Sequence, residues 1–378
     1  MSLLSRLFKK PEAEPESQPE EFAFKQRVEA FWTWYSSVAD RFYQTIEEKR
    51  CSDLTEEISG KVDELLPGMA WVFGPGEGGI GHSLTLSGEG ILAKQLLAAY
   101  CLSRAPQLEG WTFHASRQPR EDSSDFSIQM GEMSFKPIEF WVAPEIDEEQ
   151  EHFDLTVWHP LADQVELRHC QIALFLILDE IFGEFGTGRW IGAMDFSHKK
   201  LGSSMPISEL KSFIDEAVTG RGWKMWTPGE TWTSYRIPPE KMDDTRPRRD
   251  TIAGSTACWN PLRAYLDGDE EEIPFEDFHA DWVYLAFDTS TLPKDDLVGA
   301  REDMSYAIST ALEEALSGRP LGGAIGKNKS YIDFLIYDGN RSINIIREAA
   351  RRAGMPEGTR LEYLGDSGRK PGTFLFAD

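Results

Sequence analysis

The amino-acid sequence predicts an α+β protein in which antiparallel sheets carry helices packed on one face. Three observations support this class. Apolar residues near the start of the chain recur at helical spacing, and several short runs after residue 70 alternate between apolar and polar residues. Residues 282–364 order strands and helices as β-α-β-β-α-β. A length of 378 residues corresponds to two or three domains.

Composition and charge limit the classes of function. Hydrophobic residues make up 40% of the chain and include 12 Trp and 22 Phe, which is enough to build cores and excludes global disorder. The 64 Asp and Glu outnumber the 39 Lys and Arg, so the formal charge is −25. Nucleic acid and anionic lipid would both repel such a chain, so we expect no nucleic-acid binding and no stable membrane insertion. The four Cys form no C-x-x-C pair, which argues against a zinc ribbon and a disulfide scaffold.

Residues 1–21 are expected to form a disordered tether. The opening MSLLSRLFKK mixes basic with apolar residues and lacks the apolar run of a secretory signal. It is either a frayed end or a weak membrane-surface contact. Residues 11–21 are rich in Pro and Glu and cannot build a core. No stretch approaches the roughly 20 apolar residues of a membrane span, so a cytoplasmic location is expected.

Residues 22–220 are expected to form one or two α+β domains. Apolar residues from Phe24 to Ile46 step by three and four, which predicts a long helix. The acidic segment 145–151 is expected to be a solvated loop, because charge runs are usually exposed. The other predicted elements are helices over 54–66, 91–104, 163–185 and 208–218, a hairpin of strands 70–73 and 82–87, and strands over 111–116, 126–130, 134–142, 153–158 and 190–196.

Residues 221–280 differ in composition and periodicity from the segment before them. They hold six prolines and little periodicity, and residues 267–281 are strongly acidic. An irregular stretch of this length is unusual inside a compact domain. We therefore expect an irregular acidic, Pro-rich linker region with a domain boundary.

Residues 281–378 give the clearest pattern. Apolar residues alternate from Tyr331 to Tyr337 and predict a strand, and Pro293 and Gly318 flank a predicted helix. The expected order is strand 282–287, helix 297–316, strands 321–325 and 331–337, helix 342–353 and strand 359–364. This is the order of a ferredoxin-like domain, so we expect four antiparallel strands with two helices on one face.

Several segments resemble known proteins. The segments FWTWYSSVADRFYQTI, WVFGPG and LTLSGEG near the start, and WVYLAFDTSTLPKDDLVGAREDM, GGAIGKNKSYIDFLIYD and RSINIIREAARRAGMP near the end, are similar to an uncharacterised bacterial family of unknown function. The C-terminal portion also resembles the regulator of ribonuclease activity B. That regulator is a small acidic protein that binds an enzyme and does not itself catalyse a reaction. The resemblance therefore implies a binding role and supplies no catalytic residues.

Two glycine-rich motifs approximate nucleotide-binding patterns without the required context. Gly76, Gly78 and Gly81 fit G-x-G-x-x-G, but a strand-like run follows where a dinucleotide site requires a helix. The segment from Gly322 to Lys327 approximates a phosphate loop, but its glycine spacing is one residue short and a strand follows it. We interpret both as turns, the second allowing a hairpin to approach a neighbouring backbone, and we expect no cofactor.

Spacing assigns no catalytic or metal-ligating residue. None of the seven His stands in H-E-x-x-H spacing, and we expect no catalytic metal. Cys170 follows His169, but adjacent helical residues point about 100° apart and cannot act as a dyad. The alternative is an enzyme whose site is assembled from scattered His, Asp and Glu, in which His82, His114 and His169 would take part.

The sequence favours a non-enzymatic, acidic binding protein that masks or regulates a basic protein, such as a nuclease or toxin-like effector. An acidic surface speeds association with a basic partner, and Trp side chains on loops anchor many interfaces. Immunity proteins and enzyme inhibitors behave in this way. A structural or assembly protein is a further alternative, and a homo-oligomer is compatible with the sequence. The candidate partner-binding residues are Glu148, Glu149, Trp226, Trp232, Trp259, Glu270, Glu271 and Glu272.

Overall fold

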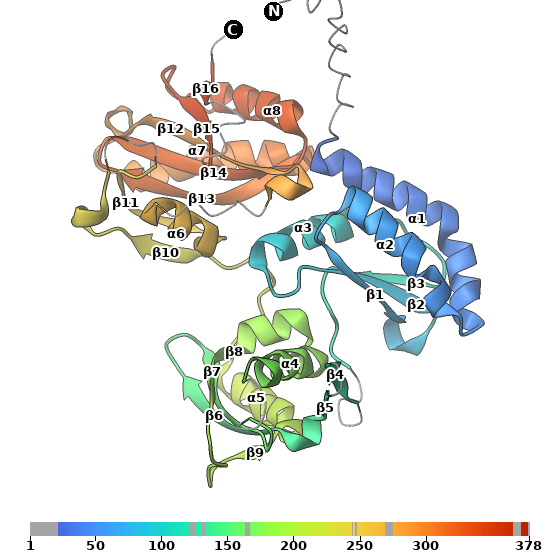
Figure 1. Cartoon of the computed structure of the whole chain (residues 1–378). Helices are drawn as coiled ribbons and strands as arrows, with labels where there is room; N and C mark the ends of the chain where they lie inside the picture. Colours follow the sequence, from blue (N-terminus) through green and yellow to red (C-terminus); the bar gives the residue numbers. More distant parts are fainter. Residues whose placement is uncertain are drawn as a thin grey trace, which may run out of the picture.

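The computed structural model divides into three groups of helices and strands (Figure 1). Within the described residues it contains eight α-helices and four sheets. The expected tether at 1–21 lies outside those residues. The structure describes residues 22–120, 126–130, 133–162, 167–243, 245, 248–268, 275–365 and 372–376. No helix among them is both long and apolar enough to cross a membrane.

The N-terminal unit is a three-stranded sheet covered by helices. The helical stripe at its start is buried, as the spacing predicts, and Phe24, Phe31 and Phe42 are fully shielded. The predicted hairpin of β1 and β2 is present, but β2 and β3 are parallel because α3 crosses between them. The elements are α1 (Phe24–Glu47), α2 (Thr55–Leu65), β1 (Ala70–Pro75), β2 (His82–Ser87), α3 (Leu92–Ser103) and β3 (Trp111–His114).

The middle unit repeats this path, because β6, β7, α4 and β8 form another hairpin followed by a helical crossover to a parallel strand. Its four-stranded sheet has the order β8-β7-β6-β9. Helix α4 is apolar nearly all round and buried, as expected, but it is broken at Gly183, where φ is 73°. The elements are β4 (Ile128–Met130), β5 (Met133–Phe135), β6 (Trp141–Asp147), β7 (His152–Trp158), α4 (Leu167–Trp190), β8 (Ile191–Phe196), β9 (Met205–Pro206) and α5 (Ile207–Arg221).

The C-terminal unit is a seven-stranded sheet with the order β10-β11-β13-β14-β12-β15-β16. The predicted strand around Tyr331 and the predicted helix after Pro293 are both present. The pairs β13–β14, β14–β12 and β12–β15 are antiparallel. The elements are β10 (Thr233–Arg236), β11 (Thr251–Thr256), α6 (Trp259–Asp267), β12 (Asp281–Asp288), α7 (Leu297–Glu314), β13 (Gly318–Gly326), β14 (Lys329–Ile336), α8 (Gly339–Arg352), β15 (Arg360–Tyr363) and β16 (Thr373–Phe374).

Residues 221–280 are more regular than the sequence indicates. Strands β10 and β11 extend the sheet beyond β13, and Leu262 and Leu266 of α6 are buried in the core. Strands as short as β10 leave little periodicity, and Pro261 is accommodated in the first turn of α6, where its missing N–H would be unpaired in any case. The strand pairing of this segment is therefore decided by contacts with β13 that are distant in sequence.

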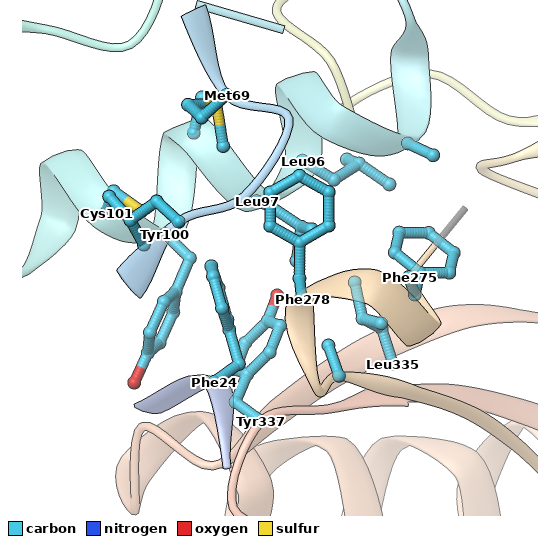
Figure 2. Packing of buried hydrophobic residues seen from close by; sticks show 14 of the residues in the cluster. Phe24, Met69, Leu96, Leu97, Tyr100, Cys101, Phe275, Phe278, Leu335 and Tyr337 are labelled. Carbon is cyan, nitrogen blue, oxygen red and sulfur yellow. The ribbon is translucent and has the colours of Figure 1, made fainter. Parts of the chain in front are cut away.

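The seven-stranded sheet is covered on both faces, whereas the sequence predicted helices on one. Helices α7 and α8 pack on the face that carries Val283 and Phe334. The opposite face packs against α6 and the N-terminal unit in a shared core. In that core the rings of Tyr100 and Tyr337 lie 4.1 Å apart, and Phe24 lies 5.5 Å from Tyr100 (Figure 2). Strands β12 and β14 are buried on both sides. Their side chains therefore pack alternately against α7 and α8 on one face and against the shared core on the other.

Candidate functional site

One face of the middle sheet is turned away from the helices and carries aromatic and acidic side chains. Alternation along β6 and β7 places Val142, Phe153 and Val157 in the core with α4 and α5. The opposite positions are half-buried or exposed. In register order across β6 and β7 they are Trp141 and Trp158, Ala143 and Thr156, Glu145 and Asp154, and Asp147 and His152. We call this surface the open face.

The open face is acidic at one end and aromatic at the other. Asp195 of β8 lies beside Thr156 and adds an exposed carboxylate. At the aromatic end, the Lys200 ammonium stands 2.7 Å from the centre of the Trp141 ring, a cation–π contact. In protein interfaces, aromatic side chains often act as anchors and charged side chains surround them. A sheet face with half-buried aromatics and exposed acids has the same composition.

Three possible metal ligands meet at the acidic end. The His152 Nε2 atom lies 3.3 Å from Asp154 Oδ1 and 3.8 Å from Asp147 Oδ2. Asp147 Oδ1 accepts backbone hydrogen bonds from Glu149 and Gln150, and Asp154 Oδ1 accepts one of 2.6 Å from Ala193. Among the described residues, this is the one group of three such side chains whose ligand atoms all lie within 4.8 Å.

Two of the candidate partner-binding acids lie next to this face. Glu148 and Glu149 are exposed in the turn between β6 and β7. Glu148 pairs with Arg221 at 2.9 Å, which reduces the charge it offers to a partner. The expected solvated loop is thus shorter than predicted, because Glu145 to Asp147 belong to β6. Cross-strand pairing with β7 extends the strand into the acidic run.

The candidate tryptophans lie elsewhere. Trp226 and Trp232 are 39% and 45% exposed and belong to the chain segment that joins α5 to β10. Trp259 packs on the Tyr235 ring, 4.9 Å between centroids, and contributes to the core. The other three candidates, Glu270, Glu271 and Glu272, lie outside the described residues.

Sequence reasoning missed the aromatic pair of the open face. Trp141 and Trp158 are paired across β6 and β7, although 17 positions separate them in the chain. A signal was present, since WVAPEID and HFDLTVW both alternate between inward apolar and outward residues. Pairing the two runs as a hairpin would have placed Glu145 opposite Asp154 and Trp141 opposite Trp158.

The three histidines of the enzyme alternative are not brought together. His82 stacks near Tyr43 and Trp111 on one side of the N-terminal sheet. His114 lies beside Thr85, three residues along β2 from His82, and so faces the other side. Burial lowers the pKa of His114, with Glu77 opposing the change. His169 belongs to α4 in the middle unit.

The glycines of these motifs occur at turns and where two backbone segments lie close together. Strand β2 follows directly after Gly81, so a dinucleotide helix is not present there. A Cβ at Gly322 would lie 2.4 Å from the Ser255 carbonyl oxygen, and one at Gly326 would lie 2.5 Å from Asp250 Oδ1. Glycine lets β13 approach β11 at these positions, as we expected for a hairpin near another strand.

A buried charge network lies behind those glycines. The Arg248 guanidinium donates to both carboxylate oxygens of Asp333, at 2.6 and 3.2 Å, and both side chains are fully buried. It also donates to Tyr235 and Thr251. Burial is the strongest single influence and lowers the pKa of Arg248, but Asp333 and Tyr235 together raise the pKa above its ordinary value. Since its donors are occupied and shielded, we interpret this network as structural.

A second buried cluster joins the N-terminal and middle units. Glu184, just after the break in α4, accepts hydrogen bonds from Ser87 at 2.7 Å and Gln95 at 2.8 Å. Asp179 is buried in α4 before the break, and its Oδ1 atom has no hydrogen-bond partner among the described residues. Burial raises the pKa of Asp179 to about 6, and the nearby Thr187 hydroxyl opposes the rise.

Comparison with known proteins identified no relative. No protein-family model, no functionally described protein and no solved structure matches the chain.

Proposed function

We propose that this chain is a non-enzymatic binding protein that engages a basic protein through the open face of its middle sheet. The observation that carries the proposal is the open face itself, on which Glu145, Asp154 and Asp195 share one side of the sheet with two tryptophans. The formal charge of −25 would steer a basic partner toward the chain. A toxin-immunity or enzyme-inhibitor role in the cytoplasm belongs to the same proposal.

The resemblance to the regulator of ribonuclease activity B supports a binding role. The strand order β13-β14-β12-β15, together with α7 and α8, supports a ferredoxin-like classification of this unit. We propose this classification as part of the same relationship. Fold class alone does not assign an activity, so the function depends on the open face.

Salt-dependent kinetics with matched charge variants test the proposal. A partner is first captured from the source cells at low salt, purified, and required to be basic. The face variant combines Glu145→Gln, Glu149→Gln and Asp195→Asn. Its association rate at low salt should fall by about ten-fold, with a smaller change in dissociation, because steering acts on encounter. The difference should shrink at physiological salt, where the Debye length is about 8 Å.

The control variant removes three exposed acids from the N-terminal unit, by Asp40→Asn, Glu56→Gln and Asp63→Asn. It has the same net charge as the face variant. If both variants slowed association equally, the attraction would come from the overall charge of the chain, and the role of the open face would be rejected. Trp158→Ala should instead raise the dissociation rate, since a half-buried aromatic anchor holds the formed complex. If no basic protein is captured, the binding proposal is rejected.

A further inference from the structure

We propose that Asp147, His152 and Asp154 form a binding site for a divalent transition-metal ion of the zinc type. This site departs from our sequence-based expectation of no metal, and it stands independently of the proposed function. The ligand atoms come from two strands, because Asp147 and His152 face each other across the hairpin and Asp154 follows His152 on the same side of β7. Register, and not sequence spacing, brings them together.

The donor set suits zinc in its chemistry. Zinc is bound in proteins by imidazole nitrogen and carboxylate oxygen, and sites with three protein ligands leave a fourth position to water or another group. Calcium and magnesium favour oxygen ligands alone, so the imidazole of His152 argues against them. All three ligand atoms lie within 4.8 Å of one another, close enough for one ion to bridge them after small side-chain rotations.

The surroundings orient the two carboxylates. Asp147 Oδ1 is held by the backbone amides of Glu149 and Gln150, at 2.9 and 2.8 Å, which leaves Oδ2 turned toward His152. The Ala193 amide holds Asp154 in place at 2.6 Å. Hydrogen bonds of this kind position metal ligands and maintain their affinity.

Strand β8 approaches two of the donor atoms closely. Its pairing with β7 is shifted near Gly192 by one extra residue, as in a β-bulge. A Cβ at Gly192 would lie 2.3 Å from Asp154 Oδ1 and 2.5 Å from His152 Nε2. Any other residue would therefore push these two donors apart. The glycine and the bulge both fall beside His152 and Asp154, so β8 passes these donors without displacing them.

Calorimetric titration of the chelator-treated full chain with Zn²⁺ tests the site. We expect saturable binding of one ion per chain. The variants His152→Ala and Asp154→Asn should each weaken binding by about ten-fold or more, because each removes one of three donors. Gly192→Ala should also weaken it, although it removes no donor. His198→Ala, which deletes an exposed histidine of the same unit, is the matched control and should bind as the unmodified chain does.

Side-chain NMR of the unmodified chain gives a readout that does not depend on variant folding. On addition of Zn²⁺ the imidazole signals of His152 should shift in step with saturation, while those of His198 stay in place. Absence of saturable binding would overturn the site. Binding that survives His152→Ala, or shifts confined to other histidines, would show adventitious binding elsewhere and overturn it equally. Failure here leaves the open-face kinetics unaffected, so the two proposals can be separated.

Discussion

Two charged clusters on different sheets differ in what surrounds them. Arg248 and Asp333 lie inside the C-terminal unit with both side chains fully buried and their hydrogen-bonding groups engaged by protein. Asp147, His152 and Asp154 lie on the open face, half-buried, and meet each other at longer distances. A ligand cannot reach the first cluster, because it is buried, whereas the second cluster is accessible to one. Burial therefore separates charges that support the fold from charges available for binding.

The largest effect should follow from breaking the buried pair. Asp333→Asn leaves the Arg248 guanidinium without its counter-charge in the core, so the free energy of unfolding should fall by about 3–5 kcal/mol. Urea unfolding measures it. Replacing both residues by apolar ones, Arg248→Met with Asp333→Leu, should cost much less than Asp333→Asn. If the single and double variants were equally destabilised, the loss would not arise from an unpaired charge.

Asp179 offers an intermediate case, because it is buried without a full set of partners. Its pKa is raised from 3.8 to about 6, mainly by burial, so the folded chain holds this proton more tightly than the unfolded chain. The free energy of unfolding should therefore decline as the pH rises from about 4 through about 6. Asp179→Asn removes this ionisation and should stabilise the chain at pH 8 by up to about 3 kcal/mol, with little effect at pH 4.

Unfolding at a series of pH values checks this prediction. Glu216→Gln, which alters an exposed acid on α5, is the control and should leave the pH dependence unchanged. A stability difference between Asp179→Asn and the unmodified chain that is the same at pH 4 and pH 8 would contradict the assigned titration.

A smaller loss of stability is expected when an added methyl group crowds the buried polar groups near β11 and every charge is kept. In Gly326→Ala the new Cβ would lie 2.5 Å from Asp250 Oδ1, so the Asp250 carboxylate must shift. The shift disturbs the hydrogen bonds that Asp250 Oδ2 accepts from the backbone amides of Asn328 and Lys329. The free energy of unfolding should fall by about 2 kcal/mol in thermal or urea unfolding. Gly358→Ala meets nothing within 4 Å and is the matched control. Similar losses in both variants would show that general backbone effects dominate.

The smallest effect on stability should come from the open face. Glu145→Gln alters an exposed side chain and should change the free energy of unfolding by less than about 0.5 kcal/mol. The same holds for Glu149→Gln. The comparison would fail if either change destabilised the chain as strongly as the changes in the buried network, because the open-face acids would then be structural as well.

Local periodicity was sufficient for the long elements. The stripe from Phe24 to Ile46 predicts α1 almost to the residue, and the alternation before Tyr337 predicts β14, because each pattern is complete within one element. Strands β10 and β11 were not predicted, since four to six residues of mixed character carry no clear period. Strand β11 joins the sheet through β13, which lies more than 60 positions further along the chain.

By itself, then, the sequence determined the α+β class, the order of most elements and the acidity that disfavours nucleic acid. The tertiary structure alone decided which side chains meet. Asp147 faces His152 because of strand register, Gly192 faces both donors of β7 because of a bulge, and Arg248 reaches Asp333 across 85 positions. Periodicity is a property of neighbouring residues, whereas register and burial depend on packing between distant segments, so a candidate site built on them becomes visible only in the folded chain.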